Sequence, residues 1–197
     1  QNLIFLKGGE TVDITGNAST FPAEYTITGD AKKDNDFFKA CQKYLSSYGQ
    51  KLNIEQLMMG DEKAFLAGMQ KIETDFNKNI EEKVKEYNPS SAVVNWKKDD
   101  VKAAVLNLMV NYQLGKQQMS GNPSFKLSKA FSDYEEKLQD NKDNMLKTSP
   151  FYRQYLLTKL STDFQKFAQT KNDPRHNYTT TEMFNMFLKS KKDLSQT

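Results

Sequence analysis

The sequence predicts a mainly α-helical protein, with six or seven helices packed as an irregular bundle behind two or three short N-terminal β-strands. Two observations lead to this prediction. Before residue 30, short runs rich in β-branched and aromatic residues end at glycine. After residue 30, apolar residues recur every three or four positions, which is the period of an amphipathic helix. The chain has 197 residues, 37% of them hydrophobic and 12% aromatic, which suits a globular core and not a disordered chain.

The strand prediction covers three segments, at residues 3–6, 11–15 and 24–28. Gly8 and Gly9 follow the first segment, and they indicate a turn because they lack the helix and Lys-Ser/Thr of a phosphate-binding loop. Three short strands make a poor sheet unless something covers one face. We therefore expect residues 1–29 to be the remnant of a sheet domain that begins upstream, and residues 30–197 to form a helical domain.

The helical stretches begin and end at local signals. Apolar faces indicate helices within residues 37–48, 53–87, 101–115, 127–138, 150–167 and 179–188. Asn88-Pro89 should end the second, Ser149-Pro150 should start the fifth, and Thr179 with Glu182 forms a capping box before the last.

The charge pattern argues against nucleic-acid binding. There are 28 basic and 25 acidic residues, and Arg153 and Arg175 are the only arginines. The lysines alternate with Glu and Asp, as on the solvated face of a helix, whereas nucleic-acid binders cluster basic charge and favour Arg. No apolar run of about 18 residues occurs, so we expect no transmembrane segment.

Cysteine and histidine, the residue types typical of redox and metal sites, each occur once in the chain. Cys41 is the only cysteine, and a dithiol redox site needs a second sulfur. It shares a helical face with Phe37 and Leu45, which predicts a small buried hydrophobic residue. His176 is the only histidine and has one nearby carboxylate, Asp173, which is too little for a zinc site or a catalytic triad. No catalytic, metal or cofactor site is predicted.

Two pairs of carboxylates, Asp61-Glu62 and Asp99-Asp100, precede apolar-periodic segments. Acidic side chains at that position oppose the positive end of the helix dipole, so we expect both pairs to cap helices. Trp96 stands beside apolar neighbours and is expected to anchor the core.

Two stretches together resemble a known family: residues 5–16 with 25–30, followed by a Phe-rich helix, and residues 144–156. Both look like the region that precedes the thioredoxin domain in envelope thiol–disulfide oxidoreductases of Bacteroidetes-type bacteria. The resemblance implies a periplasmic or outer-envelope location, a lipid anchor at a removed N-terminus, and a C-terminal thioredoxin-like partner domain in the same parent chain. The Cys-x-x-Cys of that family is missing, so none of its catalytic residues carries over.

The first functional hypothesis is therefore a non-catalytic accessory module that positions the redox domain or its substrate proteins. The alternative is a stand-alone helical envelope protein that binds a peptide or glycan in a groove between helices. A third, weaker hypothesis is a hydrolase with dispersed carboxylates, which would require two carboxylates within about 10 Å in one cleft.

Overall fold

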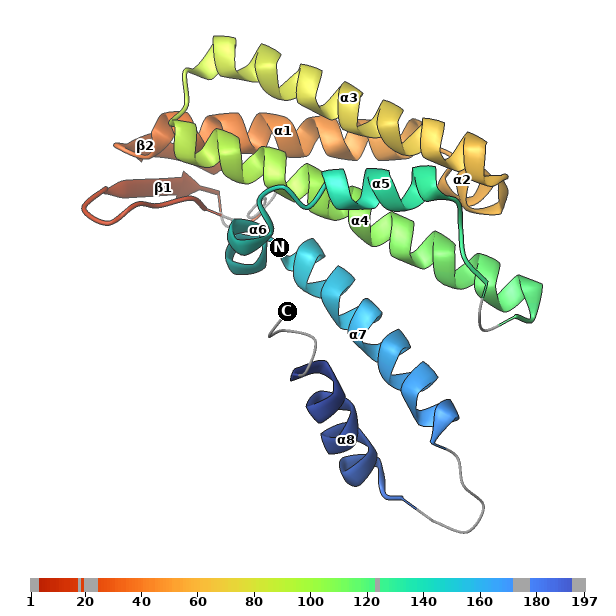
Figure 1. The fold of residues 1–197 in the computed structure, drawn as a ribbon. Helices are drawn as coiled ribbons and strands as arrows, with labels where there is room; N and C mark the ends of the chain where they lie inside the picture. Colours follow the sequence, from red (N-terminus) through yellow and green to blue (C-terminus); the bar gives the residue numbers. More distant parts are fainter. Residues whose placement is uncertain (1–3, 18, 20–24, 123–124, 172–177, 193–197) are drawn as a thin grey trace.

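A computed structural model of the chain describes residues 4–17, 19, 25–122, 125–171 and 178–192. In these residues a two-stranded antiparallel sheet precedes eight helices, which confirms the mainly α prediction (Figure 1). The elements are β1 (Val12–Gly16), β2 (Tyr25–Gly29), α1 (Lys32–Lys51), α2 (Ile54–Met59), α3 (Glu62–Tyr87), α4 (Ser91–Ser120), α5 (Lys129–Lys137), α6 (Lys142–Thr148), α7 (Pro150–Thr170) and α8 (Thr180–Lys192).

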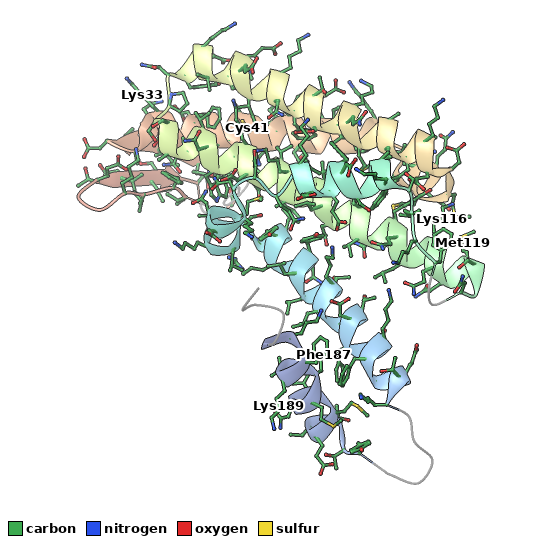
Figure 2. All side chains as sticks on the ribbon, in the orientation of Figure 1. Lys33, Cys41, Lys116, Met119, Phe187 and Lys189 are labelled. Carbon is green, nitrogen blue, oxygen red and sulfur yellow. The ribbon has the colours of Figure 1, made fainter. Side chains whose placement is uncertain are left out.

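Helix α4 is the centre of the arrangement, because it contacts α1, α3, α6 and α7. Helices α3 and α7 pack extensively on α4, α1 packs on α3, and α8 lies outermost, against α7 (Figure 1). Stacked rings hold α3, α4 and α5 together: the centroids of Phe65 and Tyr112 are 3.9 Å apart, and Phe131 of α5 stacks beside both. Between α7 and α8, Phe187 of α8 contacts Phe164 of α7 edge to face (Figure 2).

The strand pair lies on α1 with one apolar and one polar face. Ile14 pairs with Ile27, and residues directly opposite each other share a face of the sheet. Ile27 is buried, whereas Ile14 stays 43% exposed. Gly29 ends β2 with a φ of +92°, and a Cβ there would lie 2.6 Å from the carbonyl oxygen of Thr11. Glycine is therefore required at this position.

The predicted strand at 3–6 is wrong for its described residues, 4–6, which form no strand. The side chain of Asn35 explains the difference. Its Oδ1 accepts from the backbone N–H of Phe5 at 2.8 Å, and its Nδ2 donates to the Phe5 carbonyl at 2.8 Å. An amide side chain from α1 thus satisfies the groups that a neighbouring strand would have paired. That residues 1–29 belong to a larger sheet stays a prediction.

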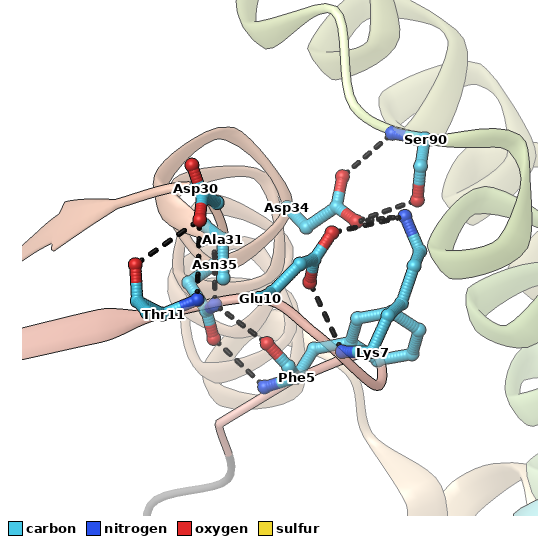
Figure 3. A network of polar contacts seen from close by, with 9 residues as sticks. All are labelled: Phe5, Lys7, Glu10, Thr11, Asp30, Ala31, Asp34, Asn35 and Ser90. Atoms are coloured by element: carbon cyan, nitrogen blue, oxygen red, sulfur yellow. Dashed lines mark hydrogen bonds and ion pairs between the residues drawn. The ribbon is translucent and has the colours of Figure 1, made fainter.

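Asp34, in the first turn of α1, joins three separate segments (Figure 3). Its carboxylate accepts from the backbone N–H of Ser90 at 2.6 Å, from the Ser90 hydroxyl at 2.5 Å and from Lys7 Nζ at 3.1 Å. Lys7 also pairs with Glu10. Asp34 is 5% exposed, so one buried carboxylate ties the N-terminal segment to the junction between α3 and α4.

Several helix ends that local signals predict are confirmed. Asp61 and Asn53 accept hydrogen bonds from backbone N–H groups three residues on, as N-caps do. Asn88 ends α3 in the left-handed conformation, with a φ of 46°. Thr179 and Glu182 exchange the two hydrogen bonds of a capping box at the start of α8.

The helices differ from the prediction in three respects. The single helix expected over 53–87 is broken at Gly60 and Asp61 into α2 and α3. A short helix, α6, was not predicted. Helix α4 begins at Ser91, ten residues before Val101, and continues past Gly115 to Ser120.

Candidate functional site

An apolar cleft is lined mainly by residues of α1, α3 and α4, with one residue each from α2 and α7. This α1–α4 groove has a volume of about 230 Å³. Its lining is largely apolar, and Leu45 and Phe151 are 40% and 41% exposed. The lining comprises Leu45, Tyr48, Gly49, Leu52, Ile54, Ile72, Phe76, Lys97, Asp100, Val101, Ala104, Val105, Leu108 and Phe151.

Lys97 and Asp100 are the only charged residues in this lining, and they are paired with each other. Lys97 is 3% exposed, and its Nζ lies 3.3 Å from Asp100 Oδ2. The ammonium also lies 5.7 Å and 5.8 Å from the ring centroids of Phe38 and Trp96. The Ser149 hydroxyl donates to the other Asp100 oxygen at 3.0 Å. The groove therefore contains a neutral, internally satisfied ion pair within an apolar wall.

The prediction that Asp99 and Asp100 cap a helix is wrong, because both lie inside α4 and are buried. Asp99 Oδ2 accepts from the side-chain amides of Asn141 at 2.7 Å and Asn144 at 2.6 Å. These donors belong to α6 and the residue before it. The two carboxylates thus anchor α6 and the start of α7 to α4, and this long-range pairing has no local signal in the sequence.

A second cleft, the α5 hollow, lies where α4, α5, α7 and the segment before α5 meet. Its volume is about 500 Å³. It is lined by Gln113, Phe125, Lys126, Leu127, Phe131, Ser132, Glu135 and Lys166. Glu135 Oε1 accepts from the Tyr155 hydroxyl at 2.7 Å and from Lys159 Nζ at 2.8 Å. Sequence reasoning identified neither cleft. The one feature of the sequence that could have indicated the α1–α4 groove is Lys97, a charged residue among the apolar residues of α4.

Cys41 is a free, buried cysteine in α1, as predicted (Figure 2). Burial raises the pKa of its thiol to about 11, although the positive charges of Lys97 and Lys83 oppose the rise. The thiolate, which is the reactive form, is therefore scarce at neutral pH.

Trp96 is half-buried and packs between Phe38 and Phe5, with centroid distances of 5.3 Å and 6.4 Å. Its Nε1 donates to the carbonyl of Thr148. This agrees with the predicted anchoring role. Of the other acidic pair, Asp61 caps α3, while Glu62 accepts from the backbone N–H of Ser128 at 3.1 Å.

The sole histidine, His176, lies outside the described residues, so its expected inert role stays a prediction. Within the described ranges, no group of three or more His, Cys, Asp or Glu residues could hold a metal ion. Each of the two clefts has one carboxylate in its lining, Asp100 in the groove and Glu135 in the hollow. Neither cleft supplies the carboxylate pair on which the hydrolase hypothesis depends.

No protein-family model, curated protein or solved structure matches this chain. Among the helices of the described residues, none combines the length and apolar character needed to cross a membrane.

Proposed function

We propose that this chain is a non-catalytic interaction module that binds an apolar segment of another polypeptide in the α1–α4 groove. One observation carries the proposal: the groove is an apolar cleft whose charged residues, Lys97 and Asp100, are already paired.

The size and chemistry of the groove favour polypeptide side chains over a glycan. Its volume of about 230 Å³ falls below the roughly 300–1,000 Å³ of pockets that enclose a small-molecule ligand. Sugar hydroxyls would lose hydrogen bonds to water against walls such as Leu52, Val101 and Leu108. Apolar side chains projecting from one face of a bound segment would instead replace water on those walls.

The family resemblance supplies a biological context for this binding. In a cell-envelope thiol–disulfide oxidoreductase, the bound segment would belong to a substrate protein, and the groove would hold that protein near a thioredoxin-like domain of the same parent chain. The buried thiol of Cys41 supports an accessory role for this chain, because its raised pKa disfavours the thiolate. A stand-alone envelope peptide binder would use the same groove and differ only in that context.

Fluorescence anisotropy with the whole chain tests the binding. The probe is a labelled amphipathic peptide with leucines at positions i, i+3, i+4 and i+7, and the matched probe carries serine at those positions. We expect only the leucine peptide to bind, and Leu45→Ser to weaken it about tenfold, or about 1.4 kcal/mol. Leu160→Ser is the control, because Leu160 is 39% exposed, close to the 40% of Leu45, and does not line the groove.

Equal binding of the two peptides, or equal effects of the two substitutions, would contradict the proposal. The oxidoreductase context has a separate test in the parent gene. If no thioredoxin-like segment with Cys-x-x-Cys follows position 197, that context fails while the role of the groove stands.

A further inference from the structure

We infer that the α5 hollow is a separate binding site for an acidic sugar, recognised through its carboxylate, its hydroxyls and one apolar ring face. The inference does not depend on the groove. It rests on an uncompensated positive charge beside hydrogen-bonding groups and an aromatic ring within one cavity.

The charge balance of the hollow differs from that of the groove. Two lysines, Lys126 and Lys166, line it, and neither forms an ion pair with any of the residues that the structure describes. The one lining carboxylate, Glu135, is already paired with Lys159 at 2.8 Å. The hollow therefore has two ammonium groups in excess, which favours an anionic ligand.

The uncharged polar groups that line the hollow indicate which kind of anionic ligand fits it. The side-chain amide of Gln113 offers a donor and an acceptor. The Ser132 hydroxyl donates to the Ser128 carbonyl at 3.5 Å, and its oxygen can still accept. Among the described residues, both hydrogen bonds donated to the Glu135 carboxylate go to Oε1, which leaves Oε2 to accept from a ligand hydroxyl. A ligand that combines a carboxylate with several hydroxyls satisfies these groups better than a fatty acid or a bare anion.

The hollow also contains an apolar patch, which suits the apolar face of a sugar ring. Phe125 and Leu127 precede α5, are partly buried and line the same cavity. The ring of Phe125 offers a flat apolar surface for the C–H face of a pyranose, as concave sites commonly combine apolar walls with a few polar groups. The volume of about 500 Å³ lies within the roughly 300–1,000 Å³ range of small-ligand sites.

Calorimetric titration of the whole chain tests the assignment with three probes: a tri-galacturonate, the neutral trisaccharide maltotriose and the apolar carboxylate octanoate. We expect the tri-galacturonate to bind at least tenfold more tightly than either of the others, and its affinity to fall as salt is raised. The double variant Lys126→Gln/Lys166→Gln should weaken it by tenfold or more.

The control is Lys71→Gln/Lys129→Gln, which removes the same net charge from exposed lysines outside the hollow. Equal loss in both double variants would mean nonspecific attraction and would overturn the inference. Maltotriose binding as tightly as tri-galacturonate would refute the role of the lysines, and preferential binding of octanoate would refute the sugar assignment. Phe125→Ala separates the ring contact from the charge, because it should weaken tri-galacturonate without changing the salt dependence.

Discussion

Replacing Asp34 by alanine is the sharpest test of how the N-terminal segment is attached to the helices. The substitution removes a carboxylate that accepts three hydrogen bonds from two distant parts of the chain (Figure 3). It leaves the N–H and hydroxyl of the half-buried Ser90 without this acceptor, which costs more than never having made the bonds.

The expected loss follows from the contacts. A hydrogen bond to a charged group contributes about 1.5–3 kcal/mol, so the two from Ser90 give a lower bound of about 3 kcal/mol. The contact with Lys7 is left out of this sum, because that lysine side chain is 38% exposed and solvent screens the pair. For a chain of this size, about 3 kcal/mol corresponds to a fall in Tm of roughly 6–12 °C.

Urea and thermal unfolding followed by circular dichroism would measure the change. Asp36→Ala is the matched control, because Asp36 lies in the same part of α1 and, among the described residues, forms its one ion pair with the exposed Lys32. Its loss should therefore stay below about 0.5 kcal/mol. In a double-mutant cycle with Ser90→Ala, the two losses should add to more than the loss in the double variant. A loss for Asp34→Ala below about 1 kcal/mol, or one equal to that of Asp36→Ala, would refute the reasoning.

Three further predictions concern pH, backbone strain and thiol reactivity. Burial acts to raise the pKa of Asp34, but the hydrogen bonds from Ser90 and Lys7 outweigh it and lower that pKa. The difference in unfolding free energy between wild type and Asp34→Ala should therefore hold above pH 5 and shrink as the pH falls below about 4; a difference that grows in acid would contradict this. Gly29→Ala should destabilise the protein by about 2 kcal/mol or more in urea unfolding, whereas Gly115→Ala, in open space within α4, should stabilise it by about 0.5–1 kcal/mol. Cys41 should react with iodoacetamide at pH 8 at least about 100-fold more slowly in the native protein than in guanidinium, as mass spectrometry would show, and comparable rates would disprove its burial.

The features that could be predicted from the sequence are those that depend on residues close together in the chain. The end of α3 at Asn88 and the capping box at Thr179 are local arrangements, so their residue types predicted them. Two of the three predicted strands, which the structure places at 12–16 and 25–29, and the helical body also followed from periodicity. These features need no knowledge of what lies across the fold.

The sequence did not predict features that depend on a partner far away in the chain. Asp99 and Asp100 look like capping residues until Asn141, Asn144 and Ser149 are brought to them by the fold. The start of α4 was misplaced for that reason. Both clefts escaped prediction in the same way, because each is lined by three or more elements that are far apart in sequence.

The length of α4 has a consequence for any experiment that measures distances in this protein. Its 30 residues extend over about 45 Å at 1.5 Å per residue, and Met119, 65% exposed, marks the far end (Figure 2). Leu108 lines the groove and Gln113 lines the hollow, five positions apart on this one helix. An unbroken ladder of backbone hydrogen bonds, rather than a loop, therefore sets the spacing of the two clefts. Two probes attached near the ends of α4 would therefore stay at a constant distance. That distance would serve as the reference for measuring any displacement of α7 and α8 relative to α4.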